Sequence, residues 1–108
     1  MIRLDPKYAW SNKGAALFSQ GKYDEAIKAY DKAIRLDPND AAARSNKGVA
    51  LFSQGKYDEA IKCYNEAIRL DPNDAAAWYN KGVALDALGK TTEANAAFTE
   101  AKEQGYSE

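Results

Sequence analysis

The feature that most constrains what this chain can fold into is a repeat of 34 residues. Gly14, Gly48 and Gly82 follow one another at that interval. The segments Lys7–Asp40 and Ala41–Asp74 differ at only seven of their 34 positions. A fixed period of this length is typical of an array of stacked supersecondary units, in which each unit buries its apolar face against its neighbours.

The repeat divides the chain into three full units. We expect the first at residues 7–40, the second at 41–74 and a third, more divergent one at 75–108. Residues 1–6 carry the motif Ile-Arg-Leu-Asp-Pro, which also ends the first two full units. We therefore expect residues 1–6 to be the remnant of a preceding repeat, as if the chain had been cut from a longer array.

Within each unit, the spacing of the apolar residues predicts two helices separated by a glycine turn. Gly21 suits a left-handed helix end, and Pro38 stops the second helix. Gly14 lies inside the first helix at a cost of about 1 kcal/mol relative to alanine, so we expect two helices to approach closely there. The predicted fold is therefore all-α, a helical repeat solenoid of three antiparallel hairpins. The expected helices are Tyr8–Gln20, Tyr23–Leu36, Ala41–Ser53, Tyr57–Leu70, Ala75–Leu88 and Thr92–Gln104, with N-caps at Asp5, Asp40, Asp74 and Thr91 or Thr92.

The third unit has polar residues at positions that would meet a following repeat. Asn95 and Lys102 stand where the first two units have isoleucine, and Gln104 stands where they have leucine. A terminal repeat needs an outer face that tolerates water. We therefore expect the last helix to be a polar cap.

Composition narrows the functional classes. Fifteen Lys and Arg face 16 Asp and Glu, which gives no reason to expect nucleic acid or an anionic membrane as a partner. No apolar run approaches the roughly 20 residues of a membrane span. Histidine is absent and Cys63 is the only cysteine, so we expect no metal, no cofactor, no disulfide and a reducing, cytoplasmic compartment. Without a nucleophile–base pair or a phosphate loop, the chain is not expected to be an enzyme.

These residues resemble the tetratricopeptide repeat family from Lys7 to Glu108. Arg44 departs from the family pattern by replacing a tryptophan, and lysine and leucine replace the leucine and tyrosine of the first helix. The resemblance implies a right-handed superhelix in which the first helix of each repeat lines a concave groove. The residues that match are Trp10, Trp78, Gly14, Gly48, Gly82, Ala26, Ala60, Ala94, Tyr30, Tyr64, Phe98, Ala33, Ala67 and Ala101.

One stripe of each first helix would face that groove. Asn12, Asn46 and Asn80 place one amide in each repeat, and an amide can both donate to and accept from the backbone of an extended peptide. Alternatively, these amides bond locally or to water. Tyr8 and Tyr79 are the aromatic candidates for contact. The predicted peptide-binding residues are Tyr8, Ser11, Asn12, Ala15, Phe18, Ser45, Asn46, Val49, Phe52, Tyr79, Asn80, Val83 and Asp86.

The leading functional hypothesis is a protein–protein interaction scaffold that binds a peptide segment of a partner. Self-association through the uncapped repeat edge, or a role as the accessory module of a larger enzyme, remains open. Family members that clamp acidic chaperone tails need basic residues and asparagines at five positions. Those positions here hold Ser11, Ala15, Asn46, Ala76 and Asn80, and only Asn46 fits, so we do not expect chaperone-tail binding.

A second possible contact surface is a row of lysines, one in each first helix. Lys13, Lys47 and Lys81 could form a basic rail near the groove edge. The hypothesis we favour is that their stems pack while their charged heads stay in water.

Overall fold

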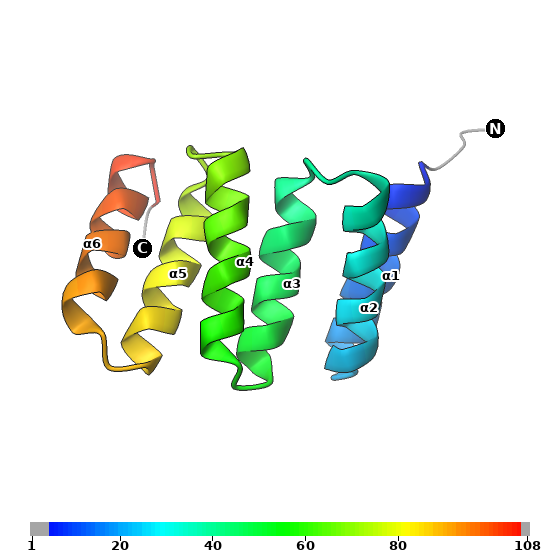
Figure 1. The fold of residues 1–108 in the computed structure, drawn as a ribbon, viewed down its shortest axis with the longest axis horizontal. Coiled ribbons are helices and arrows are strands. Elements are labelled where there is room, and N and C mark those ends of the chain that lie inside the picture. Colours follow the sequence, from blue (N-terminus) through cyan, green and yellow to red (C-terminus); the bar gives the residue numbers. More distant parts are fainter. Residues whose placement is uncertain (1–4, 107–108) are drawn as a thin grey trace.

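The computed structural model describes residues 5–106, and that part of the chain contains six α-helices and no strand. The predicted all-α repeat architecture is confirmed (Figure 1). The Ile-Arg-Leu part of the opening motif lies outside the described residues. The helices are α1 (Pro6–Ser19), α2 (Tyr23–Leu36), α3 (Ala41–Ser53), α4 (Tyr57–Leu70), α5 (Ala75–Ala87) and α6 (Thr91–Glu103).

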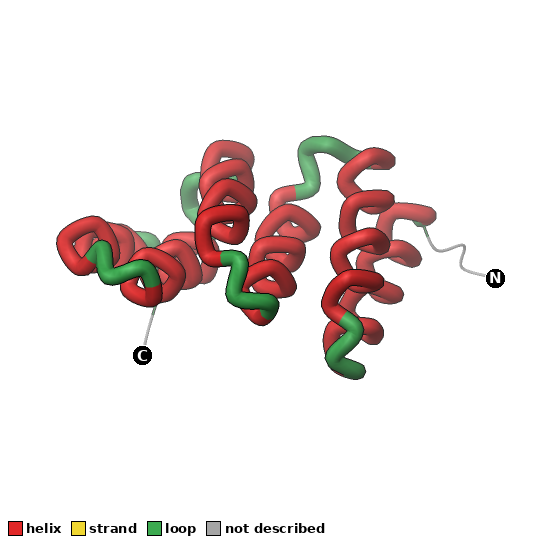
Figure 2. Tube along the Cα trace, turned by 60° about the horizontal axis from the view of Figure 1, so that its bottom comes forward, coloured by secondary structure: helices red, strands yellow, loops and turns green. Residues whose placement is uncertain are grey.

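Consecutive helices form three hairpins that stand side by side along a 48 Å axis (Figure 1). Each hairpin joins the next because α2 packs on α3 and α4 packs on α5. The first helices also touch, α1 with α3 and α3 with α5, whereas no contact joins α2 to α4 or α4 to α6 within residues 5–106. The second helices therefore splay apart, and the first helices form the inner side of the stack. Figure 2 shows that successive hairpins are also turned relative to one another.

The two helices of each hairpin meet at a glycine and an aromatic ring. A Cβ atom added to Gly48 would lie 2.6 Å from Cε1 of Tyr64, a distance that no side chain tolerates. The ring of Tyr64 is almost fully buried, at 2% exposed. Gly14 meets Tyr30 in the same way. The predicted close approach is thus confirmed, and it occurs between the two helices of one hairpin.

The turn inside each hairpin depends on a left-handed glycine, as predicted. Gly21 has a φ of 77°, and the N–H groups of Gly21 and Lys22 donate to the carbonyls of Phe18 and Leu17, both at 2.9 Å. These two bonds satisfy carbonyls that the end of α1 would otherwise leave free. The same geometry recurs at the other two hairpin turns.

The prediction that Thr91 or Thr92 caps the last helix is wrong. α6 begins at Thr91, and its N-cap is Lys90, which makes no side-chain capping bond. Lysine holds the same place before α2 and α4, with nearly the same backbone angles. The glycine turn therefore fixes where the second helix starts, whichever residue follows it. α5 ends at Ala87, one residue earlier than expected, with Leu88 as its C-cap.

Aspartates cap the first helices as predicted. The carboxylate of Asp40 accepts from the N–H of Ala43 at 3.2 Å, and Asp74 caps α5 in the same way. Asp5 caps α1, which begins at Pro6, two residues before the predicted start. Proline fits this first position because its φ is already helical and the missing N–H has no partner to lose.

Arg44 takes over a hydrogen bond that tryptophan makes in the third repeat. The indole of Trp78 donates to the carbonyl of Pro72 at 3.0 Å. The guanidinium of Arg44 donates two hydrogen bonds to the carbonyl of Pro38, at 3.1 and 3.3 Å. In both repeats the acceptor lies six residues before the donor. The departure from the family pattern at this position therefore keeps the tie between the inter-repeat loop and the following helix.

Candidate functional site

The inner side of the stack carries the predicted peptide-binding residues. They lie on α1, α3 and α5, and the structure brings these three helices together because α1 contacts α3 and α3 contacts α5. Their exposure separates residues that a ligand could reach from residues that serve packing. Tyr8, Asn12, Ala15, Asn46 and Asp86 are exposed, Ser11, Phe18, Val49, Phe52, Tyr79, Asn80 and Val83 are half-buried, and Ser45 is buried.

The three asparagines place one side-chain amide on each first helix of this surface. Asn12 and Asn46 are exposed and Asn80 is half-buried. No side-chain hydrogen bond to any of the three amides is present among residues 5–106. The alternative that the amides bond locally is therefore not what the structure shows. Each amide has its donors and its acceptor available to solvent or to a ligand.

Two phenylalanines on the inner face pack against the start of the second helix in their own hairpin. The ring of Phe18 lies 5.3 Å from that of Tyr23, and Phe52 lies 5.0 Å from Tyr57, both at tilted angles that favour aromatic pairs. Phe52 also packs against the core of the middle repeat. These rings offer only their exposed edges to a ligand.

Ser45 and Tyr79 depart from the predicted set. Ser45 is only 9% exposed, so its hydroxyl is inside the stack and cannot reach a peptide on the inner face. Tyr79 is stacked on Tyr106, with ring centroids 4.3 Å apart and planes at 10°, and is tilted against Phe98 at 5.5 Å. Sequence reasoning missed this cover, although an aromatic residue where the other units have proline was a visible signal. Tyr8, by contrast, is 51% exposed.

Charge near Tyr8 is locally balanced. The ammonium of Lys7 donates to Asp37 at 2.6 Å and also lies 4.9 Å from the ring centre of Tyr8. This hydrogen bond lowers the pKa of Asp37 below its usual value and raises the pKa of Lys7. The pair therefore offers no free charge to an incoming ligand.

The row of lysines is less uniform than we expected. Lys13 is exposed, in accord with a solvated head, and it lies 5.1 Å from the ring centre of Trp10. Lys47 is half-buried and forms an ion pair with Asp31 at 2.7 Å. Lys81 is also half-buried, 5.3 Å from the ring centre of Trp78. Each lysine thus has a different neighbour. The row is not uniform because Lys13 and Lys81 lie beside tryptophan, whereas Lys47 reaches across the junction to Asp31.

Other features limit the chemistry of the described chain. Cys63 is half-buried, and its burial raises the pKa of the thiol, so it is a weak nucleophile. Residues 5–106 contain no group of three His, Cys, Asp or Glu side chains placed to hold a metal ion. Nor does this part of the chain contain a helix long and apolar enough to cross a membrane.

Three stacked hairpins with an inner wall of first helices define a protein of the helical-repeat solenoid class. The Tetratricopeptide repeat family model matches residues 3–41, 11–74 and 45–107. The chain therefore belongs to the tetratricopeptide repeat family, as the sequence predicted.

Known proteins similar to this chain share its repeats. Over 40 residues, which are 35% of this chain, it is 48% identical to small glutamine-rich tetratricopeptide repeat-containing protein 2 of Mycosarcoma maydis, and the match covers 11% of that relative's length. Among solved structures, the second TPR of Spaghetti (RPAP3) bound to the HSP90 peptide SRMEEVD has a TM-score of 0.89 at 31% identity, over 93% of each chain. The TPR2B domain of yeast Sti1 in a pHsp70 complex has a TM-score of 0.90 at 29% identity, over 92% of this chain and 79% of that one.

Proposed function

We propose that this chain is a non-catalytic scaffold that binds an extended, uncharged peptide segment of a partner protein along its inner face. The observation that carries the proposal is the row of three amides on α1, α3 and α5. Asn12, Asn46 and Asn80 are accessible and make no hydrogen bond within the described chain. An unbonded amide repeated on three adjacent helices suits a backbone that repeats its own donors and acceptors.

The spacing of the helices suits an extended ligand. Packed helices lie about 10 Å apart, and an extended peptide advances about 3.3 Å per residue. One amide per repeat would then meet roughly every third residue of the peptide. The exposed methyl group of Ala15 and the half-buried Val49 and Val83 supply shallow apolar contacts between the amides.

The inner face favours a different peptide from those of its relatives. The second TPR of Spaghetti is bound to an HSP90 peptide, SRMEEVD, which is acidic at its C-terminal end. Among the five positions that clamp such tails in the family, this chain has no basic residue. Asp86 adds a negative charge to the inner face. The charge of the inner face therefore favours an uncharged peptide segment over an acidic tail. Separately, a single free thiol, Cys63, fits a cytoplasmic location for the protein.

A gain-of-binding experiment tests this specificity. We expect the wild-type chain not to bind the peptide SRMEEVD, because no lysine or arginine meets its carboxylates. The fourfold variant Ser11→Lys, Ala15→Asn, Ala76→Lys and Asn80→Arg should bind it in a salt-dependent way. None of these four residues is buried, so the fold should tolerate the changes. Fluorescence anisotropy with the labelled peptide measures both, and tight binding by the wild type would contradict the proposed specificity.

The amides themselves are tested by selection from a library of random peptides. The wild-type chain should enrich uncharged sequences, and the triple variant Asn12→Ala, Asn46→Ala and Asn80→Ala should lose that enrichment. A variant with three exposed glutamates elsewhere, Glu25→Ala, Glu59→Ala and Glu93→Ala, serves as the control. Equal enrichment by the triple asparagine variant would overturn the proposed function.

A further inference from the structure

Within residues 5–106, no helix packs on the face of α1 that corresponds to the faces of α3 and α5 covered by α2 and α4. Leu17, Leu51 and Leu85 occupy equivalent positions, and Leu51 and Leu85 are only 5% and 4% exposed. Leu17 is half-buried. Ala16 is exposed, while its two equivalents in α3 and α5 are fully buried. We call the surface around Ala16 and Leu17 the N-terminal edge.

The helix that covers the second repeat shows what fits this face. Ile27 of α2 packs against the core cluster that contains Leu51. Asp31 of α2 forms the ion pair with Lys47 at 2.7 Å. Asp24, in the first turn of α2, accepts a hydrogen bond across the same junction. The covering helix therefore presents aspartate, isoleucine three residues later and aspartate four residues after that, all on one face.

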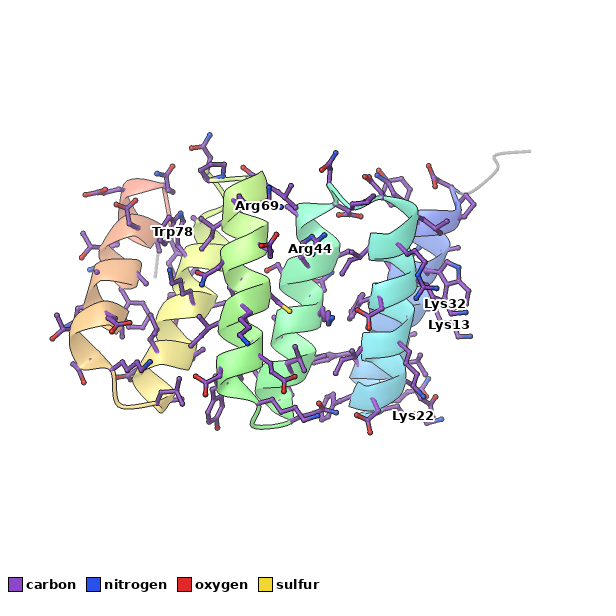
Figure 3. The ribbon with its side chains drawn as sticks, viewed as in Figure 1. Lys13, Lys22, Lys32, Arg44, Arg69 and Trp78 are labelled. Atoms are coloured by element: carbon purple, nitrogen blue, oxygen red, sulfur yellow. The ribbon has the colours of Figure 1, made fainter. Side chains whose placement is uncertain are left out.

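The N-terminal edge carries apolar and basic side chains that complement the isoleucine and aspartates of such a covering helix. It holds a hollow of about 240 Å³ lined by Trp10, Leu17, Ala29, one acid, Glu25, and three lysines, Lys13, Lys28 and Lys32. A hollow of about 250 Å³ lies at the equivalent place in the third repeat, where a single lysine faces two glutamates. Figure 3 shows Lys13 and Lys32 projecting from this edge of the stack. None of the three lysines forms an ion pair with an acid within residues 5–106. Glutamate replaces Lys32 in the second and third repeats, so the edge is more basic than the equivalent covered faces.

We propose that the N-terminal edge binds an amphipathic helix of a partner protein, in the place that α2 takes on α3. The partner helix carries an acidic residue, an aliphatic residue three positions later and a second acidic residue four positions after that. The aliphatic side chain packs on Leu17, as Ile27 packs on the cluster that contains Leu51, and an acid pairs with Lys13, the equivalent of Lys47. This site lies on a different face from the peptide-binding surface and does not depend on it.

A second copy of this chain does not meet these requirements. The open helix at its far end is α6, in which Thr92, Asn95 and Thr99 stand at the positions of the two aspartates and the isoleucine. At these three positions α6 offers neither an acid for Lys13 nor an aliphatic side chain to pack on Leu17. Two N-terminal edges placed together would oppose their own lysines, which is unfavourable.

The experiment uses the full chain and a synthetic helix. The probe is a labelled peptide with the sequence of residues 23–36, held helical by a lactam bridge on the face opposite its two aspartates and isoleucine. A bridged peptide with the sequence of residues 91–103 is the control. Fluorescence anisotropy should show saturable binding of the first peptide only. Equal binding of the two peptides, or none, would overturn the proposal.

Variants locate the site on the chain. Lys13 already lies over the ring of Trp10, so the ion pair itself adds little, and Lys13→Glu should weaken binding about twofold or more, mainly because it sets like charges together. Lys81→Glu, the same change at the equivalent position of the third repeat, should leave binding unchanged. Changing Asp31 of the peptide to lysine should weaken binding to the wild type and restore it to Lys13→Glu. Ala16→Tyr fills an exposed position and should block binding while the circular dichroism spectrum stays the same.

Two results would place the interaction elsewhere. Equal losses from Lys13→Glu and Lys81→Glu would show that binding follows net charge and not this edge. A chain that dimerises alone in sedimentation, and becomes monomeric with Lys13→Glu, would show that a second copy occupies the edge. Either result would overturn the proposal about the N-terminal edge. Neither result bears on the proposed peptide-binding surface.

Discussion

The two junctions between repeats are built on the same helix packing but differ in their polar contacts. At the first junction, α2 packs on α3, and one ion pair and one hydrogen bond cross between them. Lys47 pairs with Asp31 at 2.7 Å, and the amide of Gln54 donates to Asp24 at 2.5 Å. Both pairs are open to water, since the side chains of Lys47 and Asp31 are 28% and 41% exposed and Asp24 is exposed.

At the second junction, where α4 packs on α5, neither pair exists. Asn65 stands in the place of Asp31, and Leu88 stands in the place of Gln54. Isoleucine is common to both junctions, since Ile27 and Ile61 each pack against the core cluster that contains the leucine of the next repeat. The comparison indicates that apolar packing holds the hairpins together and that the polar pairs add little. The predictions below test this ranking.

The largest effect is expected from removing the shared isoleucines. Ile61 packs against the core clusters of both the middle and the third repeat, whereas Ile27 packs against the middle one alone. Ile61→Ala should lower the free energy of unfolding by about 3 kcal/mol and Ile27→Ala by about 2 kcal/mol. Urea denaturation followed by circular dichroism measures both. Losses below about 1 kcal/mol would show that the polar pairs matter more than the packing.

Gln54→Leu, which copies the residue of the second junction, should stabilise the first one. Gln54 donates one hydrogen bond, but its Oε1 atom is buried and has no hydrogen-bond partner. A buried oxygen without a partner costs about 1–3 kcal/mol. The hydrogen bond to the carboxylate of Asp24 offsets only part of this cost, because Asp24 is exposed and water can replace the amide there. We expect a gain of about 1 kcal/mol in the free energy of unfolding. Gln20→Leu, at an exposed equivalent position, is the control and should change little.

Most of the fold follows from the sequence, because it rests on features that recur every 34 residues. Helix boundaries for α2, α3 and α4 were predicted to the residue, since glycine, proline and aspartate mark each end. The close approach at Gly48 was also predictable from a costly glycine that recurs inside a helix. Residues that recur at the same position of each repeat are the ones that the repeat geometry requires, so a single sequence is enough to identify them.

Features that occur once were harder to predict. The stacking of Tyr106 on Tyr79 joins residues in different elements of the third repeat, and its only signal in the sequence is the replacement of proline by tyrosine at position 106. Ser45 is buried although its equivalent Ser11 is half-buried, so its burial depends on the helices around α3, which the stripe of α3 alone cannot show. From the sequence alone, arginine in place of tryptophan at position 44 suggests a lost contact. In the structure, however, the guanidinium of Arg44 donates to the carbonyl of Pro38, which is equivalent to the carbonyl that Trp78 bonds. The remaining peptide-binding residues stay a prediction.

The ion pair at the first junction should contribute only modestly. Asp31 is 41% exposed and Lys47 is 28% exposed, so water and salt screen their attraction. A double-mutant cycle with Asp31→Asn and Lys47→Met should give a coupling free energy of about 0.5 kcal/mol that falls in 1 M salt. The corresponding cycle with Asn65→Ala and Lys81→Met should give none. A coupling above about 1.5 kcal/mol that persists in high salt would contradict this view of the junction.

The smallest effect is expected from transplanting the ion pair to the second junction. Asn65→Asp supplies the missing carboxylate, but Lys81 already lies over the ring of Trp78. At the first junction, Arg44 stands in the place of Trp78, so Lys47 has no such ring and is free to pair with an acid. To pair with the new acid, Lys81 must leave a cation–π contact worth about 0.5–1 kcal/mol, which is as much as an exposed ion pair contributes. We therefore expect Asn65→Asp to change the free energy of unfolding by less than about 0.3 kcal/mol. The same change combined with Trp78→Leu should recover a salt-sensitive coupling, measured as a cycle with Lys81→Met. A clear gain from Asn65→Asp alone would mean that tryptophan does not hold the lysine, and that the two junctions differ only because one aspartate is missing.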